Sequence, residues 1–166
     1  MEVRVKIGGS ATALKCTAGT LFLYREFFGK EFISEMGEKD DINANFKFMW
    51  ACAKTADPSF MPPEIWAEQV ARHDLTVPIT TAMKLLERSI KIDDDIETEE
   101  DGTSAEAEWS SAKMIAQGLM VGLSYADMRE MSVGLLISVL KKFCGIRTGG
   151  DEPKSRKATQ EDFDKF

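Results

Sequence analysis

The sequence predicts a mainly α-helical protein with a small N-terminal β-hairpin and a short C-terminal helical module. Three observations predict this class. Val3, Val5 and Ile7 alternate with polar residues, a pattern that is typical of a half-buried strand. Apolar residues then recur at the three- and four-residue intervals of amphipathic helices through most of the chain. The run DDDIETEED at 93–101 separates two such helical parts.

The acidic run determines the predicted domain organisation. Seven of its nine residues are acidic, and the net charge of the whole chain is −7, so the rest of the chain is balanced. Such a segment repels itself and has little to bury, so we expect a solvated linker. The predicted parts are an N-terminal hairpin plus helical domain (1–92), the acidic linker (93–103), a C-terminal helical extension (104–145) and a mobile polar tail (146–166).

The positions of glycine and threonine residues predict the first elements, a β-hairpin and a helix. Gly8-Gly9 predicts a tight turn, so that Ala11–Cys16 returns as the second strand of a hairpin. A lone hairpin is marginal in water, so it must lie on a helix or on another copy of the protein. Thr17 then caps a helix that ends at Gly29. The apolar face of this helix holds Leu21, Tyr24 and Phe28.

Three more helices are predicted before the acidic run. The first spans about Ile42–Ala56 and ends at Asp57-Pro58, the next opens at Pro62-Pro63, and the last starts near Pro78. Their apolar residues are, in turn, Phe46, Met49, Trp50 and Ala53; Ile65, Trp66, Gln69 and Val70; and Ile79, Met83, Leu86 and Ile90.

Three helices are predicted after the acidic run. Ser104 caps the first, which extends to about Leu119 and is followed by Gly122. A capping box at Ser124–Asp127 opens a short helix to about Met131, and Ser132 caps the last, which Gly145 stops. The apolar residues are Ala105, Trp109, Ala112, Ile115 and Leu119 in the first helix, and Leu135, Leu136, Val139, Leu140 and Phe143 in the last.

The composition favours a cytosolic protein that binds neither nucleic acid nor membrane. No apolar run approaches the roughly 20 residues that span a bilayer, and the N-terminus lacks the apolar core of a signal peptide. A pI near 4.9 argues against a nucleic-acid binder. Three widely spaced cysteines, an odd number, fit reduced thiols.

No catalytic, cofactor or metal residue is predicted, so we expect a protein that is not an enzyme. His73 is the only histidine, and we expect it at a helix end or on the surface. Its adjacency to Asp74 in the sequence does not place the two side chains face to face, so it does not indicate acid–base catalysis. The cysteines lack the spacing of metal ligands, and Cys52 is interpreted as a small buried residue. Gly8-Gly9 lacks the phosphate-binding fingerprint, and the acidic run lacks the central glycine of a calcium loop.

A helix-turn-helix regulator is the less favoured alternative. Leu119–Leu140 can form two helices joined at a turn. Before Lys141-Lys142, however, Arg129 is the only base, and Asp127 and Glu130 offset it. DNA affinity depends mainly on positive charge.

Three runs of the sequence carry a family resemblance. The first is VKIGGSATALKCTAGTLFLYREFFGKEF, the second FKFMWACAKTADPSF with PEIWAEQV, and the third GLSYADMREMSVGLLISVLKKF. The first two resemble the opening strands and helices of phage and prophage tail assembly chaperones, especially those of Gram-positive siphophages, and Trp66 stands at the family's Trp. The third resembles the extension of the long form, which is added by ribosomal frameshift or encoded as a continuous fusion. The matching residues of the first run are Cys16-Thr17-Ala18-Gly19, Tyr24-Arg25-Glu26 and Phe28-Gly29-Lys30-Glu31-Phe32.

The resemblance implies a function in assembly. Such chaperones bind the tape measure protein, a long helical chain with exposed apolar stripes, and their extension recruits tail tube subunits. They self-associate, work in the host cytoplasm and are absent from the mature virion. A helical groove can hold an amphipathic partner helix, a tether raises the local concentration of a second partner, and an open hairpin edge favours self-pairing.

The candidate partner-binding residues are aromatic and apolar. Four aromatic residues of the N-terminal part are assigned first to folding, because aromatic residues at helical spacing usually pack in a core: Tyr24, Phe28, Trp50 and Trp66. The other class of function that remains open is a structural virion component, such as a head–tail connector or a tail terminator. The candidates are Tyr24, Phe28, Trp66, Met128, Met131, Leu135 and Leu136.

Overall fold

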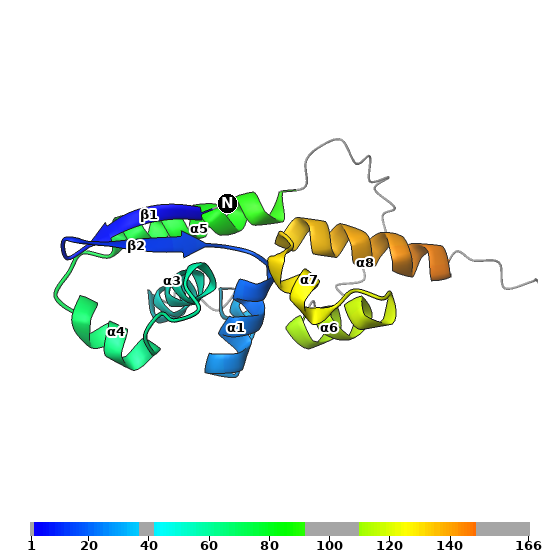
Figure 1. The fold of residues 1–166 in the computed structure, drawn as a ribbon, viewed down its shortest axis with the longest axis horizontal. Helices are drawn as coiled ribbons and strands as arrows, with labels where there is room; N and C mark the ends of the chain where they lie inside the picture. Colours follow the sequence, from blue (N-terminus) through cyan, green and yellow to red (C-terminus); the bar gives the residue numbers. More distant parts are fainter. Residues whose placement is uncertain (1, 37–41, 92–109, 149–166) are drawn as a thin grey trace, which may run out of the picture.

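The computed structural model describes residues 2–36, 42–91 and 110–148, and for 144–148 it describes the helical backbone alone. Within these residues the chain is mainly helical with one N-terminal hairpin, as predicted (Figure 1). The predicted acidic linker, the Ser104 cap and the tail beyond Thr148 lie outside the described residues. The elements are β1 (Glu2–Ile7), β2 (Ser10–Lys15), α1 (Ala18–Phe28), α2 (Phe32–Met36), α3 (Ile42–Ala56), α4 (Pro63–Val70), α5 (Thr76–Ile90), α6 (Ser111–Met120), α7 (Tyr125–Glu130) and α8 (Val133–Thr148).

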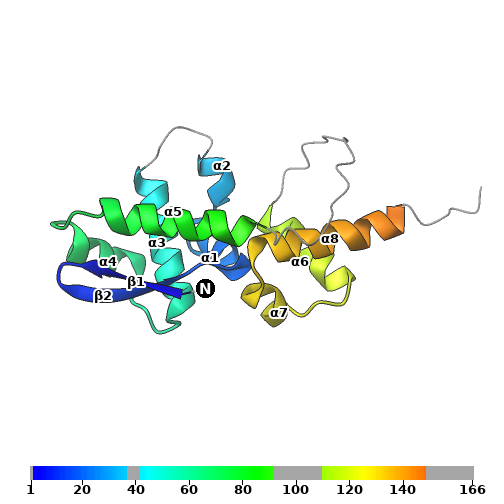
Figure 2. The same ribbon diagram turned by 90° about the horizontal axis from the view of Figure 1, so that it is seen from above.

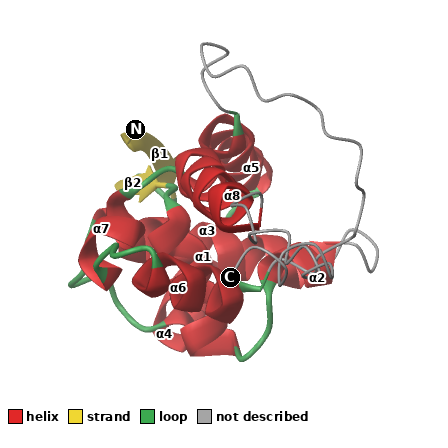
Figure 3. Ribbon diagram, turned by 90° about the vertical axis from the view of Figure 1, so that its right-hand side faces the viewer, coloured by secondary structure: helices red, strands yellow, loops and turns green. Residues whose placement is uncertain are grey.

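The hairpin has the predicted turn. Gly8 and Gly9 have φ of 56° and 88°, a left-handed conformation that glycine adopts without steric cost. A Cβ at Gly8 would meet the imidazole of His73, which is exposed and would have to move aside. The strands pair antiparallel with Ile7 opposite Ser10, and the hairpin lies beside α5 and above α3 (Figures 1 and 3). These helices bury one face of a hairpin that would be marginal alone.

The ends of α1 are those predicted from the sequence. Thr17 stands at the N-cap in an extended conformation, and its backbone N–H donates to Oγ1 of Thr20 at 3.1 Å. Gly29 has φ 69°, and its N–H donates to the carbonyl of Arg25 at 2.9 Å. Glycine at this position satisfies a terminal carbonyl without Cβ strain.

An aromatic cluster joins α1, α2 and α3. The Tyr24 and Phe32 rings lie 5.2 Å apart edge to face, and Phe32 stacks on Phe48 with centroids 4.1 Å apart. Phe28 meets Trp50 edge to face at 5.5 Å. The short helix α2, which the sequence did not predict, supplies Phe32 to this core.

The predicted bounds of α3 and the start of α4 are confirmed. Met49, Trp50 and Ala53 are fully buried, and Phe46 is half-buried. Trp50 Nε1 donates to the carbonyl of Met61 at 2.9 Å, which holds the segment after α3 against the helix. On α4, Trp66 and Val70 are buried, whereas Ile65 is 50% exposed.

The buried face of α5 is rotated about the helix axis relative to the predicted apolar face, so this prediction is wrong. The helix starts at Thr76, and its fully buried side chains include Pro78, Ala82, Leu85 and Ser89 as well as Leu86. The predicted Ile79 and Met83 are only half-buried, and Ile90 is 44% exposed. The helix contacts α3, α8 and the hairpin, and the small residues Ala82 and Ser89 are among its buried side chains.

Two predictions for the C-terminal helices are also wrong. The helix α6 begins at Ser111, where Ser110 is the N-cap, so it does not extend back to Ser104. Its buried residues are Ser111, Met114 and Gly118, whereas the predicted Ala112 and Leu119 are exposed and Ile115 is half-buried. The last helix continues through Gly145 to Thr148, because glycine costs only about 1 kcal/mol inside a helix and does not by itself end one. Ala105 and Trp109 lie outside the described residues.

Other boundaries in this part agree with the sequence. Gly122 has φ 91° just after α6, the hydroxyl of Ser124 accepts from Asp127 N at 3.1 Å, and Ser132 accepts from Leu135 N at 3.2 Å. In Figures 1 and 2, α8 lies beyond the C-terminal end of α5 and roughly in line with it.

The helices on both sides of the acidic run share one hydrophobic core. Ala18 N donates to the carbonyl of Met131 at 2.9 Å, and Val133 N donates to the buried Ser89 hydroxyl at 3.0 Å. The rings of Phe22 and Tyr125 are stacked 5.8 Å apart. The buried cluster runs continuously from the hairpin through α1, α3 and α5 to α6, α7 and α8. The C-terminal helices are therefore packed directly on the N-terminal ones.

Candidate partner-binding surfaces

Most of the residues predicted to bind a partner belong to the core. Phe28 and Met131 are half-buried, and only Leu135 offers substantial area, being 43% exposed. The structure brings Tyr24 and Phe28 together, with ring centroids 5.0 Å apart, but does not gather the seven residues at one surface. Four of them are buried and have no area for a partner in this conformation: Tyr24, Trp66, Met128 and Leu136.

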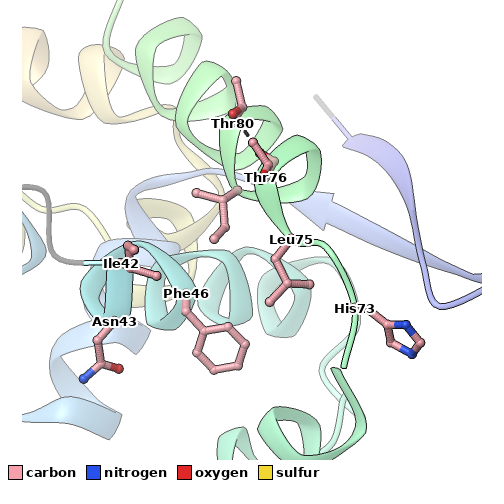
Figure 4. Close-up of a pocket in the computed structure, with 8 residues that line it drawn as sticks. Ile42, Asn43, Phe46, His73, Leu75, Thr76 and Thr80 are labelled. Carbon is pink, nitrogen blue, oxygen red and sulfur yellow. Dashed lines mark hydrogen bonds between the residues drawn. The ribbon is translucent and has the colours of Figure 1, made fainter. Parts of the chain in front are cut away.

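An open groove lies between the first turns of α3 and α5. Its volume is about 750 Å³, and its lining is mostly apolar. In Figure 4, Phe46 and Leu75 extend toward one another from the two sides. Ile42, at the start of α3, is 76% exposed. The full lining is Ile42, Asn43, Phe46, His73, Leu75, Thr76, Ile79 and Thr80.

Polar groups along the groove have partners within the protein. The Thr80 hydroxyl donates to the carbonyl of Thr76 at 2.8 Å (Figure 4), and Thr76 N donates to Oδ1 of Asp74 at 2.9 Å. His73 points away from Phe46 in Figure 4. The groove therefore offers apolar surface without a set of convergent polar groups that would orient a small substrate.

The Phe46 ring, which lines the groove, is held in place by buried aromatic residues. Phe46 stacks on Trp66 with centroids 5.1 Å apart, and Phe60 meets Trp66 edge to face at 5.4 Å. Trp66 is itself only 3% exposed. Trp66, which the sequence singled out, thus supports the groove from the core in this structure.

A second crevice lies between α1, α6 and α7 and holds both acidic and basic side chains. Its volume is about 570 Å³, and it is lined in part by Arg25, Glu26, Tyr125 and Arg129. Arg25 is bound to Glu31 at 2.8 Å, and the Arg129 guanidinium lies 5.8 Å from the centroid of Tyr125. Arg25 is thus paired with a carboxylate, and Glu26 adds a negative charge to the same crevice, so the crevice is not a purely basic anion site.

A pair of buried thiols among the described residues has shifted pKa values. Cys16 and Cys52 are both buried and free. Hydrogen bonding from Cys52 lowers the pKa of the Cys16 thiol, and burial raises the pKa of Cys52 well above its ordinary value. The interpretation of Cys52 as a small buried residue is confirmed, since it is fully inaccessible. Neither thiol lines a groove described above.

Sequence reasoning missed the groove because two of its apolar residues, Ile42 and Leu75, lie outside the predicted apolar faces, although Phe46 and Ile79 belong to those faces. Ile42 was assigned only as the start of α3, and Leu75 was not assigned to any element. The signal that points to them is an apolar side chain at or just before the start of a helix, outside the predicted apolar face of that helix.

The remaining site types find no support in the described residues. Within 2–36, 42–91 and 110–148, no three His, Cys, Asp or Glu residues are grouped so as to hold a metal ion. None of the helices in those ranges has the length and apolar character needed to cross a bilayer. Comparison with protein families, with curated protein sequences and with solved structures gives no match to this chain.

Proposed function

We propose that the protein is a phage tail assembly chaperone that binds the tape measure protein and recruits tail tube subunits. The observation that carries the proposal is the open apolar groove between α3 and α5, taken with the sequence resemblance described above. The protein acts by binding alone in the host cytoplasm and is absent from the finished particle.

The groove suits one face of an amphipathic helix. Such a helix presents apolar side chains at three- and four-residue spacing, and a groove of helices receives them without any reaction. Ile42, Phe46 and Leu75 supply the apolar walls, and the interhelical position leaves the groove open at the surface. Self-association is part of the proposal, because the outer edge of a two-stranded hairpin can pair with another strand.

Exposed apolar residues extend beyond the groove. Ile33 and Met36 on α2 are 44% and 41% exposed, and α2 packs against α3. A long helical client with a continuous apolar stripe would contact such an extended surface along its length. Shielding that stripe from water would keep the client soluble.

The test is capture of a purified tape measure fragment by the full chain. Ile42→Asp combined with Thr80→Arg places charge and bulk in the groove, and we expect at least tenfold weaker binding. Leu119→Asp is the matched control, because Leu119 is 56% exposed on α6 and does not line the groove. Unchanged binding by the groove variant, or no binding by the native chain, would overturn the proposal.

Mass spectrometry of purified particles separates this function from its rival. An assembly factor is missing from finished particles, whereas a connector or tail terminator remains in stoichiometric amount. Recovery of the chain in particles would therefore favour the structural class.

A further inference from the structure

Two buried cysteines from separate elements meet in the core. Cys16 follows β2 and directly precedes Thr17, the N-cap of α1, whereas Cys52 lies in α3. Both are free thiols, and Cys16 is 6% exposed whereas Cys52 is fully inaccessible. The two side chains are hydrogen-bonded to one another. The fold thus brings together two thiols that are 36 positions apart in the sequence.

The packing of α3 against β2 and α1 holds the two thiols together. Both of these elements contact α3. Four residues after Cys16 and three after Cys52, Thr20 Oγ1 and Thr55 Oγ1 lie 2.9 Å apart, so the same two segments also touch at a second point. The Thr55 hydroxyl in turn donates to the carbonyl of Ala51 at 2.8 Å. The thiol contact therefore belongs to a packed interface between α1 and α3.

The surroundings make Cys16 the more readily ionised of the two thiols. The hydrogen bond with Cys52 lowers the pKa of Cys16, and the hydroxyls of Ser89 and Thr20 act in the same direction, so that together they outweigh burial. The N-terminus of α1 also favours negative charge at this position. Burial raises the pKa of Cys52 well above its ordinary value. An ionisable thiol beside a protonated one is the arrangement of an attacking and a resolving cysteine.

We infer that Cys16 and Cys52 form a reversible redox pair, which a small peroxide oxidises to an intramolecular disulfide. Cys16 meets the oxidant, because it alone of the two has any exposed surface. Hydrogen peroxide is close to water in size, so this narrow access suits it better than a larger oxidant. Cys52 then resolves the oxidised Cys16 from within the core.

The reaction has two steps. In the first, the Cys16 thiolate attacks one oxygen of the peroxide, an S–O bond forms, and the O–O bond breaks. The departing hydroxide takes up the proton that the Cys16 thiol released, which gives water and leaves Cys16 as a sulfenic acid. In the second, the Cys52 sulfur attacks the Cys16 sulfur, an S–S bond forms, and the hydroxyl leaves with the Cys52 proton as a second water. The two thiols lose two electrons in all, and these reduce the peroxide.

The test uses the full chain with Cys144→Ser, which leaves Cys16 and Cys52 as its only cysteines. The folded protein is treated with hydrogen peroxide, and the surviving thiols are alkylated with iodoacetamide in denaturant before the intact mass is measured. We expect a monomer that takes up no iodoacetamide, and that takes up two molecules once dithiothreitol has reduced it. Binding of a tape measure fragment has no part in this readout, so the inference stands or falls separately from the proposed function.

Two further variants of this chain assign the roles of the thiols. With Cys52→Ser added, Cys16 should stop at the sulfenic acid, which dimedone labels. With Cys16→Ser added, Cys52 should react with peroxide at least tenfold more slowly than Cys16 does, because it is fully buried and stays protonated. Circular dichroism checks that each variant is folded. The parent Cys144→Ser chain retains both thiols, so it tests the disulfide even where a variant fails to fold.

Three results would overturn the inference. Two alkylatable thiols remaining after peroxide treatment of the folded chain would show that the pair is inert. A disulfide that forms only in urea would show that the native contact does not support the bond. Reaction of Cys52 as fast as that of Cys16 would remove the distinction between the attacking and the resolving thiol.

Discussion

Gly19 gives the clearest example of a single residue that connects the two helical parts. It lies in α1, and a Cβ built there would stand 2.8 Å from the backbone carbonyl oxygen of Arg129 and 3.1 Å from the Arg129 Cβ. A backbone atom cannot move aside as a side chain can, so glycine permits the close approach of α1 and α7. The Thr-Ala-Gly run that supports the family resemblance therefore has a packing reason in this protein.

We predict that Gly19→Ala lowers the free energy of unfolding by about 1–2 kcal/mol, because overpacking at backbone outweighs the gain in helix propensity. Gly118→Ala is the paired substitution, since its Cβ would meet Sδ of Met128, which lies near the end of a flexible side chain. Urea unfolding of both variants should show the larger loss for Gly19. An equal or smaller loss at Gly19 would contradict this account of the α1–α7 contact.

Glu35 is the most buried carboxylate of the described chain and has two donors. Tyr24 Oη donates to its carboxylate, and Lys30 Nζ lies 2.9 Å from Oε1. Burial alone raises its pKa, but the hydrogen bonds from Tyr24 and Lys30 outweigh burial, so the pKa of Glu35 lies below its ordinary value. The charged form is therefore favoured by folding and stabilises the protein at neutral pH.

We predict that Glu35→Gln lowers the free energy of unfolding by about 1–2 kcal/mol at pH 7. Because the folded pKa is depressed, this contribution is present above the ordinary Glu pKa, about 4.3, and is lost as pH falls through the lower folded value. Denaturant unfolding at pH 7 and pH 3 should show the difference shrinking. Glu26→Gln, on the exposed part of α1, is the control and should change little at either pH. A difference that is constant with pH would exclude an ionised role for Glu35.

At the scale of elements, the sequence predicted where helices begin and end better than which face they bury. Thr17, Gly29 and Ser124 act locally, so capping and turn chemistry could be read directly. The buried face of α5 depends on contacts with the hairpin, α3 and α8, which are distant in sequence, and it includes the small Ala82 and Ser89, whereas Ile79 is half-buried. The groove was missed for the same reason, because it forms only when the first turns of two helices that are distant in sequence come together.

The junction of α5 and α8 depends on one buried hydroxyl. Ser89 Oγ accepts the hydrogen bond of Val133 N at 3.0 Å, in a buried position that water does not reach. We predict that Ser89→Ala costs about 1–3 kcal/mol, because the buried N–H loses its partner. Ser132→Ala removes the N-cap bond to Leu135 N and should cost about 1 kcal/mol, since that cap is exposed.

Urea unfolding of the two serine variants measures both losses under the same conditions. A loss for Ser89→Ala no larger than that for Ser132→Ala would show that the buried bond does not stabilise the junction. The comparison is matched, because each substitution removes one hydroxyl that accepts from the first turn of the same helix.

At the scale of the whole molecule, polar contacts surround the junction between its two helical parts. The Glu31 carboxylate accepts from Ser111 N at 2.9 Å and Ser111 Oγ at 2.6 Å, which satisfies the start of α6 from the N-terminal part. Lys15 donates to Glu130 at 2.6 Å across the same junction, although exposed pairs of this kind stabilise little. In addition, α1 contacts α7 and α5 contacts α8. These contacts join the two parts in addition to the covalent link through 92–109.

We predict that the two parts stay associated after the chain is cut between them. A specific protease site placed within 92–109 yields an N-terminal and a C-terminal fragment, which should elute together in gel filtration at micromolar concentration. Met128→Lys places a charge in the fully buried contact and should make the cleaved fragments separate. The uncut native chain and the uncut Met128→Lys chain are the controls for elution volume and for folding. Separate elution of the native fragments would show that the shared core is too weak to act without the tether, and the two parts would then have to be treated as independent modules.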